Sequence, residues 1–251
     1  MIDALYSAAT GMRAQQTSLD AIANNLANAT TTGFKRDRVD LVDLEYVTFT
    51  LPSGEEGQVG LGAAPGELGK EHTPGVLQNT ARDLDLAIEG PGFFQVTRRD
   101  GTLAYTRAGN LQIDASGRLA LQTGELLQPR ITVPAEATDL SIAANGAVSA
   151  NVNGELRELG DIPTAAFANP AGLRPVGNSM YAPTVNSGAA QLGDPTGDGR
   201  GRIVQGALEA SNVNVGTEII SMITTQRAFE AASRVVTASD EMMGIANALR
   251  Q

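Results

Sequence analysis

The sequence predicts an α+β protein in which long N- and C-terminal helices pair as a coiled coil and an antiparallel β-domain is inserted between them. Three observations lead to this fold class. At both ends of the 251-residue chain, apolar residues recur every seven positions, which indicates helices with a buried stripe. Between the two ends, apolar and polar residues alternate and turn-forming pairs follow closely, as in antiparallel strands. Passages rich in Gly and Pro separate the two patterns.

The first helix is expected from near Asp3 to about Ala27. The run 28–33, which reads NATTTG, combines poor helix formers with a glycine suited to a left-handed cap, so the helix should end there. An amphipathic helix gains most of its stability from packing its apolar face, so this helix needs a partner. Its stripe consists of four apolar residues spaced seven apart: Leu5, Met12, Leu19 and Leu26.

The C-terminal helix repeats this pattern with a broader apolar face. Asn212 or Asn214 is the expected N-cap, and Glu218 lies in the first turn, where the helix dipole favours an acid. Because two apolar rows adjoin, pairing with the first helix would leave apolar surface exposed, which predicts packing against copies of this chain or related chains. One row contains Met222, Phe229, Val236 and Met243, and the other contains Val235, Met242 and Leu249.

The sequence divides into three parts on these patterns. The terminal helical domain comprises 1–34 plus 212–251, and a β-rich outer domain is expected over 76–211, with its strands concentrated before a loop-rich passage at 183–201. Residues 35–75, rich in Gly and Pro from 51 onward, are predicted as an extended linker or irregular loop. Four turn signals support the antiparallel strands: Asp100-Gly101, Ala115-Ser116-Gly117, Asn145-Gly146 and Asn153-Gly154.

Composition excludes several classes of function. A net charge of −10 argues against nucleic acid or an anionic membrane surface as a partner. The chain has no Cys, which rules out disulfides and thiolate metal sites. No apolar run approaches the roughly 18 residues of a membrane-spanning helix, so no membrane insertion is expected. The N-terminus lacks the basic and apolar regions of a cleavable signal peptide.

Candidate catalytic and metal-binding residues are few. His72 is the only histidine and lies in a Gly/Pro-rich loop without a nucleophile elbow. Asp83 and Asp85 have the chemistry for hydrolysis by a wall-acting enzyme, but at alternate strand positions they are more simply the solvated face of a sheet. The run 194–199 resembles the start of a calcium loop, although Gln205 replaces the bidentate Glu. We therefore predict no enzyme activity, no metal and no cofactor.

Three stretches of the chain carry recognisable motifs. They are Ser7–Met12, Ile22–Asn28 and Thr32–Arg36 at the N-terminus, Gly90–Val96 in the middle, and Glu209–Val215 with Gln226–Glu230 at the C-terminus. These motifs resemble those of the bacterial flagellar rod and hook axial proteins. The similarity extends nearly end to end, and within the family it is greatest to the distal rod proteins. The segment between 43–46 and 51–54 is shorter here than distal rod proteins tend to have, so a proximal rod protein remains an alternative.

The resemblance implies a structural subunit of the basal-body rod, which self-assembles into a tubular drive shaft that transmits torque and encloses the export channel. The terminal helices would form the inner tube and the β-domain the outer layer, in the basal body within the cell envelope and periplasm. The implied partners are copies of itself, proximal rod and hook proteins, the surrounding ring proteins and the flagellar type III export apparatus. Export through that apparatus would need no cleaved signal peptide.

The resemblance also suggests roles for residues near the helical stripe. Asn24, Asn25 and Asn28 are predicted to form hydrogen bonds between subunits, because amides near a helical seam fix register. The alternatives are that they are solvated or cap the helix end, and that the heptad residues form an intrachain core. A soluble coiled-coil adaptor of fixed oligomeric state is a further interpretation of the same helices.

Overall fold

The computed structural model describes residues 2–50 and 55–249, which fall into two compact units. The first, which we call the terminal-helix unit, comprises Met1–Ala27, Asp37–Gly69 and Asn214–Gln251. The second, the β-unit, comprises Asn28–Arg36 and Lys70–Val213. The class is α+β, as predicted, with helices at the two ends of the chain and antiparallel strands between them.

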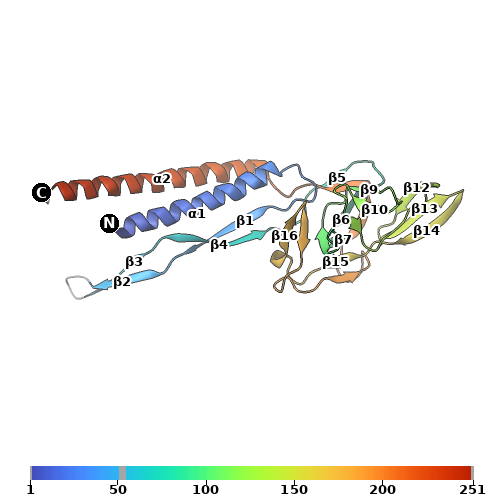
Figure 1. Ribbon diagram of the computed structural model, residues 1–251, viewed down its shortest axis with the longest axis horizontal. Coiled ribbons are helices and arrows are strands. Elements are labelled where there is room, and N and C mark those ends of the chain that lie inside the picture. Colours follow the sequence, from blue (N-terminus) through green and yellow to red (C-terminus); the bar gives the residue numbers. More distant parts are fainter. Residues whose placement is uncertain (1, 51–54, 250–251) are drawn as a thin grey trace. The chain divides into compact units, whose positions relative to one another are not determined.

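The terminal-helix unit contains two long helices that lie side by side and two strand pairs (Figure 1). The strand pairs β1–β4 and β2–β3 follow one another along the same ribbon, because Leu44 N–H donates to Gly62 O and Leu61 N–H donates to Glu45 O. The elements are α1 (Ile2–Ala27), β1 (Asp37–Asp43), β2 (Tyr46–Thr50), β3 (Glu56–Gly60), β4 (Ala63–Lys70) and α2 (Val215–Ala248).

Helix α1 ends, and helix α2 begins, where the capping residues of the sequence predict. Gly33, in the turn that follows α1, has a φ of +65°, the left-handed conformation expected of a capping glycine. Asn214 is the N-cap of α2, because the Thr217 N–H donates to its side-chain oxygen at 3.1 Å. Among the described residues, no helix combines the length and apolar character needed to cross a membrane.

The segment 35–75 differs from the expected irregular linker, because most of it forms β1 to β4. In the β2–β3 pair, Phe49 lies opposite Gly57 and Tyr46 lies opposite Gly60. A Cβ placed on Gly57 would lie 2.7 Å from the Phe49 ring, so the ring lies across the space that the glycine leaves open. Two of the glycines that suggested a loop, Gly57 and Gly60, are therefore the cross-strand partners of aromatic residues. Residues 51–54 of this segment lie outside the described residues.

The β-unit is built almost entirely of antiparallel strands. Its largest sheet has nine strands, in the order β16-β17-β8-β7-β11-β10-β9 with β15 joining β7 to β18. Smaller sheets pair β12-β13-β14, β6 with β19 and β5 with β20. The strands are β5 (Leu77–Asn79), β6 (Leu86–Glu89), β7 (Phe93–Thr97), β8 (Leu103–Thr106), β9 (Leu111–Ile113), β10 (Leu119–Leu121), β11 (Leu126–Leu127), β12 (Ala137–Ile142), β13 (Ala147–Val152), β14 (Glu155–Asp161), β15 (Thr164–Ala166), β16 (Arg174–Gly177), β17 (Met180–Ala182), β18 (Gln191–Gly193), β19 (Arg202–Gln205) and β20 (Ala207–Glu209), with a short 3₁₀ helix at Pro170–Gly172.

Strand β7 supplies side chains to two hydrophobic clusters. Successive residues of a strand point to opposite faces, so Phe94 enters the larger cluster while Phe93 enters the smaller one. The smaller cluster also contains Tyr105, Phe167 and Tyr181. The larger includes Leu86, Ile88, Val96, Leu111, Leu119, Leu121, Leu127, Val148, Ile162 and Ile203, all at most 2 % exposed.

All four turn signals join consecutive strands of the β-unit, so the predicted hairpins are confirmed. The expectation of a solvated face at Asp83 and Asp85 is wrong for Asp85, which is only 3 % exposed. Its carboxylate lies 3.3 Å from Arg82 Nη1, and the following β6 residues 86–88 are buried on both faces. Alternation of polar and apolar residues therefore overstated the exposure of this strand.

Candidate assembly site

The heptad residues of α1 lie on a half-buried face. Leu5, Met12, Leu19 and Leu26 are all intermediate in exposure. On α2, Met222, Val236 and Met243 are also half-buried, and Phe229 is 36 % exposed. The two helices contact one another along their length, so the predicted residues occupy the sides of a packed helix pair.

A second face of α1 is buried more deeply, and the heptad pattern missed it. Ala14 is fully buried, and Ala8, Ala21 and Ile22 are 8 to 9 % exposed. On the first turns of this helix, Ser7 Oγ donates to Gly60 O at 3.1 Å, which ties α1 to strand β3. Small residues allow a backbone to approach closely, so a row of Ala and Ser marks the packed side of α1 better than its Leu and Met residues do.

Asn25 connects three elements of the terminal-helix unit. Its side chain is 1 % exposed, and its amide pairs with the backbone of Asp37 in both directions, at 2.6 and 2.9 Å. The same Nδ2 lies 3.3 Å from Glu218 Oε2 on α2. Asn24 Nδ2 donates to Asp37 Oδ2 at 2.6 Å, which holds the start of β1 against the end of α1. Asn28 accepts a hydrogen bond from Thr31 Oγ1 in the turn after the helix.

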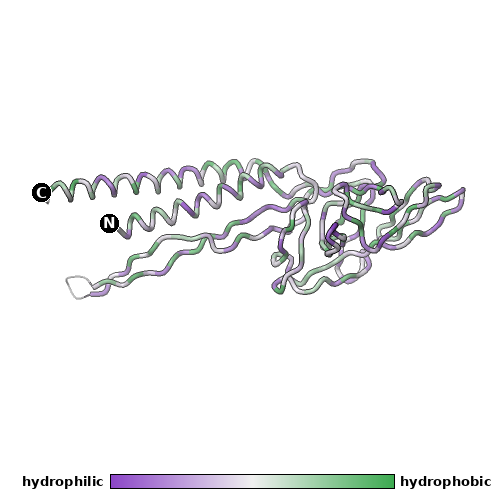
Figure 2. Tube along the Cα trace, viewed as in Figure 1, coloured by the Kyte–Doolittle hydropathy of each residue, from purple (hydrophilic) through white to green (hydrophobic). Residues whose placement is uncertain are grey.

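The outer side of α2 is an exposed apolar surface. Along the ribbon of α2, hydrophobic residues recur from one end of the helix to the other (Figure 2). Single exposed apolar residues are ordinary, but a row along a 34-residue helix indicates a surface that is covered by another chain. We call this row the α2 outer face; its residues are Ile219, Ile220, Ile223, Val235, Met242, Ile245 and Leu249, which are 44 to 84 % exposed.

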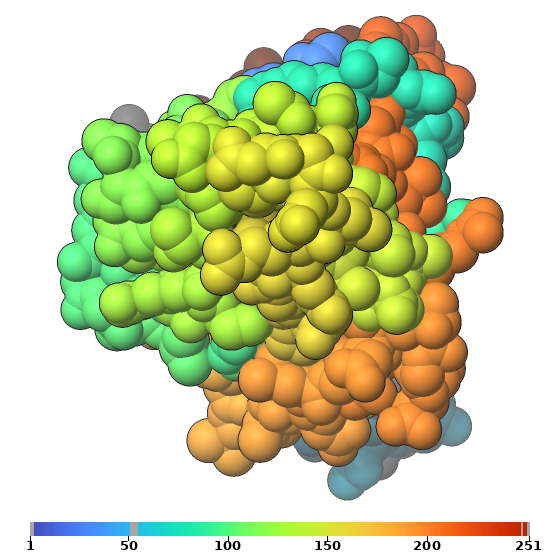
Figure 3. Space-filling view, turned by 90° about the vertical axis from the view of Figure 1, so that its right-hand side faces the viewer, coloured from blue at the N-terminus to red at the C-terminus, as the bar shows by residue number. Residues whose placement is uncertain are grey.

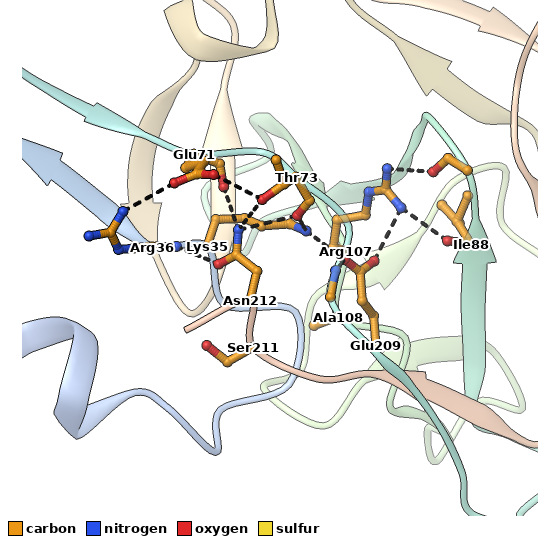
Figure 4. Close-up of polar contacts among 12 residues, drawn as sticks. Lys35, Arg36, Glu71, Thr73, Ile88, Arg107, Ala108, Glu209, Ser211 and Asn212 are labelled. Carbon is orange, nitrogen blue, oxygen red and sulfur yellow. Dashed lines mark hydrogen bonds and ion pairs between the residues drawn. The ribbon is translucent and has the colours of Figure 1, made fainter. Parts of the chain in front are cut away.

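The β-unit contains a buried ion-pair cluster that joins three distant parts of the sequence (Figure 4). Glu209, at the end of β20, is fully buried. Its carboxylate forms ion pairs with Lys35 Nζ at 2.5 Å and with Arg107 Nη1 at 3.1 Å. The Gly75 N–H also donates to the Glu209 carboxylate, at 2.8 Å. Arg107 donates in addition to the carbonyls of Ile88 and Gly90. One carboxylate thus holds together the segment after α1, the centre of the β-unit and the segment before α2.

The electrostatics of this cluster are set by burial. Removal from water lowers the pKa of Lys35, and the neighbouring Glu209 carboxylate opposes that effect. Burial also lowers the pKa of Arg107, again against the attraction of Glu209. His72 lies nearby and packs edge-on against the rings of Phe93 and Tyr181, which also contact each other. Burial, together with the positive charges of Lys35 and Arg107, lowers its pKa to about 4, so His72 is neutral at pH 7.

Asn212 fixes the segment that leads into α2. Its side-chain oxygen accepts the Arg36 N–H at 2.8 Å, and its amide nitrogen donates to Glu71 O and Thr73 Oγ1 (Figure 4). Arg36 also forms an ion pair with Glu71 at 3.3 Å. From the sequence, Asn212 was one of two candidates for the N-cap of α2, and the structure assigns that cap to Asn214 instead. The signal that could have found the role of Asn212 in fixing this segment is the set of polar residues in both terminal motifs, around Lys35 and Glu209.

Comparison with known proteins places the chain in a family. Three family models match it: the flagella basal body rod protein over residues 5–35, the flagellar hook protein FlgE/F/G D1 domain over 87–150, and the flagellar basal body rod FlgEFG protein C-terminal over 204–249. The chain is 41 % identical to the flagellar basal-body rod protein FlgG of Agrobacterium fabrum, over 96 % of this chain and 97 % of that protein. The chain belongs to the flagellar basal-body rod protein family.

Two further relatives refine this placement. The FlgG protein of Borreliella burgdorferi is 40 % identical over the whole of both chains. The FlgF protein of Salmonella typhimurium is 32 % identical over 99 % of this chain and 98 % of that protein. Similarity is thus greater to FlgG, and the resemblance to distal rod proteins is confirmed. The three family models cover α1, the centre of the β-unit and α2, which include most of the residues described above.

Proposed function

We propose that this chain is a structural subunit of the distal rod, and that its terminal helices polymerise into the axial tube of the flagellar basal body. The observation that carries the proposal is the α2 outer face, an apolar row on a helix whose other side already packs against α1. Family membership supports it, because the relatives are named as basal-body rod proteins. In this proposal the tube transmits torque and encloses the export channel.

Within one subunit, α1 and α2 pair as a two-helix coiled coil. The seven-residue spacing of Leu5, Met12, Leu19 and Leu26 and of Met222, Phe229, Val236 and Met243 supports this pairing. The exposed β2–β3 pair, with Val47 and Phe49 on its apolar side, adds a second surface to be covered on assembly. A two-stranded ribbon is marginal by itself in water, so burial of this side between subunits would stabilise it.

The three asparagines near the seam divide into two groups. Asn25 is committed to Asp37 and Glu218 of its own chain, so its role is to align the helices before assembly. Asn24 and Asn28 are more exposed, and we propose that they add hydrogen bonds to neighbouring subunits while keeping their intrachain contacts. The partners in this scheme are copies of the chain, proximal rod and hook proteins, ring proteins and the export apparatus, within the cell envelope and periplasm, with no cofactor and no catalysis.

The test replaces exposed apolar residues in each unit. The assembly variant carries Ile220→Asp and Ile245→Asp on α2, at positions that are 65 and 62 % exposed. The matched control carries Leu156→Asp and Val185→Asp in the β-unit, at positions that are 78 and 99 % exposed. Because all four side chains are exposed in the monomer, both variants should unfold at the same denaturant concentration as the parent chain.

The two variants should differ in their ability to polymerise. Buried charges without partners are costly, so the α2 variant should neither polymerise in sedimentation experiments nor restore swimming to cells that lack the gene. The control should retain both properties. Basal bodies with complete rods built from the α2 variant would contradict the proposal, and a fixed small oligomer of the parent chain would indicate a coiled-coil adaptor instead.

A further inference from the structure

We propose that Asn153, at the tip of the β13–β14 hairpin, is a site of spontaneous deamidation and isoaspartate formation, whereas the other Asn-Gly pair of the chain, at Asn145, is protected by the fold. The two pairs have the same local chemistry, since each Asn is followed by Gly in the order that gives the next backbone nitrogen free access to the side chain. They differ only in what the surrounding structure allows. Each acts as the control for the other.

The turn at Asn153 is open. Val152 pairs with Glu155, so Asn153 and Gly154 form a two-residue hairpin loop, and both are exposed. Among the described residues, the Gly154 N–H donates no hydrogen bond, and a Cβ on Gly154 would meet nothing within 4 Å. In Figure 3 residues near 150, coloured yellow, lie uncovered on the face turned toward the viewer. The peptide group between Asn153 and Gly154 can therefore flip as a unit, by rotation about the ψ bond of Asn153 and the φ bond of Gly154.

That rotation leads to the reactive geometry. Asn153 and Gly154 have φ values of +55° and +87°, as in a type I′ turn. A flip of the central peptide gives a type II′ turn, in which the first residue keeps its positive φ and takes a ψ of about −120°. At that ψ the Gly154 nitrogen lies beside the Asn153 side chain. Both turn types close a two-residue hairpin, so the flip does not require the strands to separate. A type II′ turn normally has Gly at its first central position, so Asn153 reaches this geometry as a minor, strained conformer.

The reaction then needs only water. The Gly154 nitrogen bonds to the Asn153 side-chain Cγ and gives up its proton, and the side-chain amide nitrogen takes a proton and leaves as ammonia. Water opens the resulting cyclic imide at one of its two carbonyls, which gives Asp or isoaspartate. No atom is oxidised or reduced in either step. The product adds a negative charge beside Glu155, and in the isoaspartate form it also lengthens the backbone at the hairpin tip.

The turn at Asn145 is fixed by hydrogen bonds and by the burial of Gly146, although the Asn145 residue is exposed. The Gly146 N–H donates to Ala143 O at 2.9 Å, and Gly146 O accepts from the Ile162 N–H at 2.9 Å. The Asn145 side-chain oxygen accepts from the Ala147 N–H at 3.2 Å. Gly146 is buried, and a Cβ there would collide with the Ile162 carbonyl oxygen. A flip of the Asn145–Gly146 peptide group would break the hydrogen bond from Gly146 N–H to Ala143 O, and the hydrogen bond between Gly146 O and Ile162 N–H holds the glycine against the neighbouring chain segment.

The experiment follows both sites in the same molecule. The full-length protein is incubated at physiological temperature in mildly alkaline buffer, once folded and once in urea, and sampled over time. Trypsin leaves Asn145 and Asn153 on one peptide, because no Lys or Arg lies between Arg130 and Arg157. Tandem mass spectrometry with electron-transfer fragmentation then locates each conversion and distinguishes isoaspartate from aspartate. The Asn153→Gln variant identifies the signal from the hairpin tip.

In urea both sites should convert at similar rates. In the folded protein we expect Asn153 to convert at least roughly tenfold faster than Asn145, the ratio that a modest difference in barrier height produces. The Asn153→Gln variant should lose the fast conversion and keep the slow one. Equal rates at the two sites in the folded protein, or suppression of both relative to urea, would overturn the proposal.

Discussion

The two units of this chain differ in how far they bury their large apolar side chains. In the β-unit, Leu86, Phe94 and Leu111 are at most 1 % exposed and belong to a cluster closed by the strands of the unit itself. In the terminal-helix unit, Ile220 and Ile245 are more than 60 % exposed. Burial of apolar surface is the main stabilising term in both folding and association. The β-unit therefore completes its core within one chain, whereas the terminal-helix unit leaves the α2 outer face exposed, as the proposed assembly requires.

The buried polar groups show the same difference. The β-unit surrounds Glu209 with two cations and a backbone N–H, so its buried charges are paired within the chain. In the terminal-helix unit, the buried Glu218 carboxylate accepts a hydrogen bond from the neutral amide of Asn25, and the half-buried Ser7 hydroxyl donates to Gly60 O. The stability of the β-unit should therefore fall when one partner of a buried ion pair is removed. The terminal-helix unit should instead respond to whether another surface buries its exposed α2 outer face.

Replacement of Glu209 by Gln should have the largest effect on the β-unit. It leaves Lys35 and Arg107 buried without a carboxylate, and removing one partner of a buried ion pair costs about 3–5 kcal/mol. Urea denaturation followed by circular dichroism measures the loss. Hydrogen exchange should show it in peptides of the β-unit.

The control for Glu209→Gln is Glu89→Gln, which breaks the exposed ion pair with Arg202. Both partners there are about half exposed, and the expected loss is only about 0–1 kcal/mol, as for other surface pairs. Equal losses in the two variants would show that burial of the cluster does not govern its contribution.

The sequence alone predicted most of the elements, because their signals are local. Heptad spacing, the Asn214 cap and the four turn signals depend on residues close together in the chain, and the structure places helices and hairpins there. The β2–β3 pair was missed because Gly57 and Gly60 act through their cross-strand partners, Phe49 and Tyr46. Such a pairing cannot be read from one strand.

The candidate site was predicted only in part, for the same physical reason. The rows containing Met12 and Met222 follow from spacing, but the buried face at Ala14 depends on what packs against α1. The ion-pair cluster joins Lys35 to Glu209 across 174 positions of the sequence. Long-range pairs of this kind require the fold, since no local pattern relates their members.

The same Phe→Ala substitution in each unit tests how much a buried ring and an exposed ring contribute to stability. Phe94→Ala removes a ring that is 1 % exposed in the β-unit, and such truncations cost about 3–4 kcal/mol through lost burial and the cavity left behind. Phe49→Ala removes a ring that is 46 % exposed on β2, so the loss in the monomer should be below about 1.5 kcal/mol. Denaturant unfolding of both monomers measures these values.

Assembly should reverse the order of these two variants. If the β2–β3 surface is covered between subunits, Phe49→Ala should reduce polymerisation even though its monomer is nearly as stable as the parent. Phe94→Ala, studied at a temperature where it remains folded, should polymerise normally because its cavity lies inside the β-unit. Normal polymerisation of Phe49→Ala would show that β2 is not part of the covered surface.

Acidification should weaken the β-unit through His72. The folded-state pKa of about 4 lies below the ordinary value of 6.5, so between these values the unfolded chain binds the proton that the folded chain excludes. Stability from this source is therefore fully present above pH 6.5 and falls as the pH drops toward 4. The loss should reach about 2 kcal/mol near pH 5, from a shift worth about 1.4 kcal/mol per pKa unit.

The variant His72→Phe isolates this contribution. It keeps a ring packed against Phe93 and Tyr181 and removes the titrating group, whose two nitrogens have no hydrogen-bond partner among the described residues. Since His72 is the only histidine, unfolding of the variant should lose most of its pH dependence between 6.5 and 5. Because Lys35, Lys70 and Arg107 are the charges that face His72, the change should appear in hydrogen exchange of the β-unit and leave α1 and α2 unaffected. An unchanged pH profile in His72→Phe would mean that water reaches the ring and that this part of the β-unit is less closed than its core.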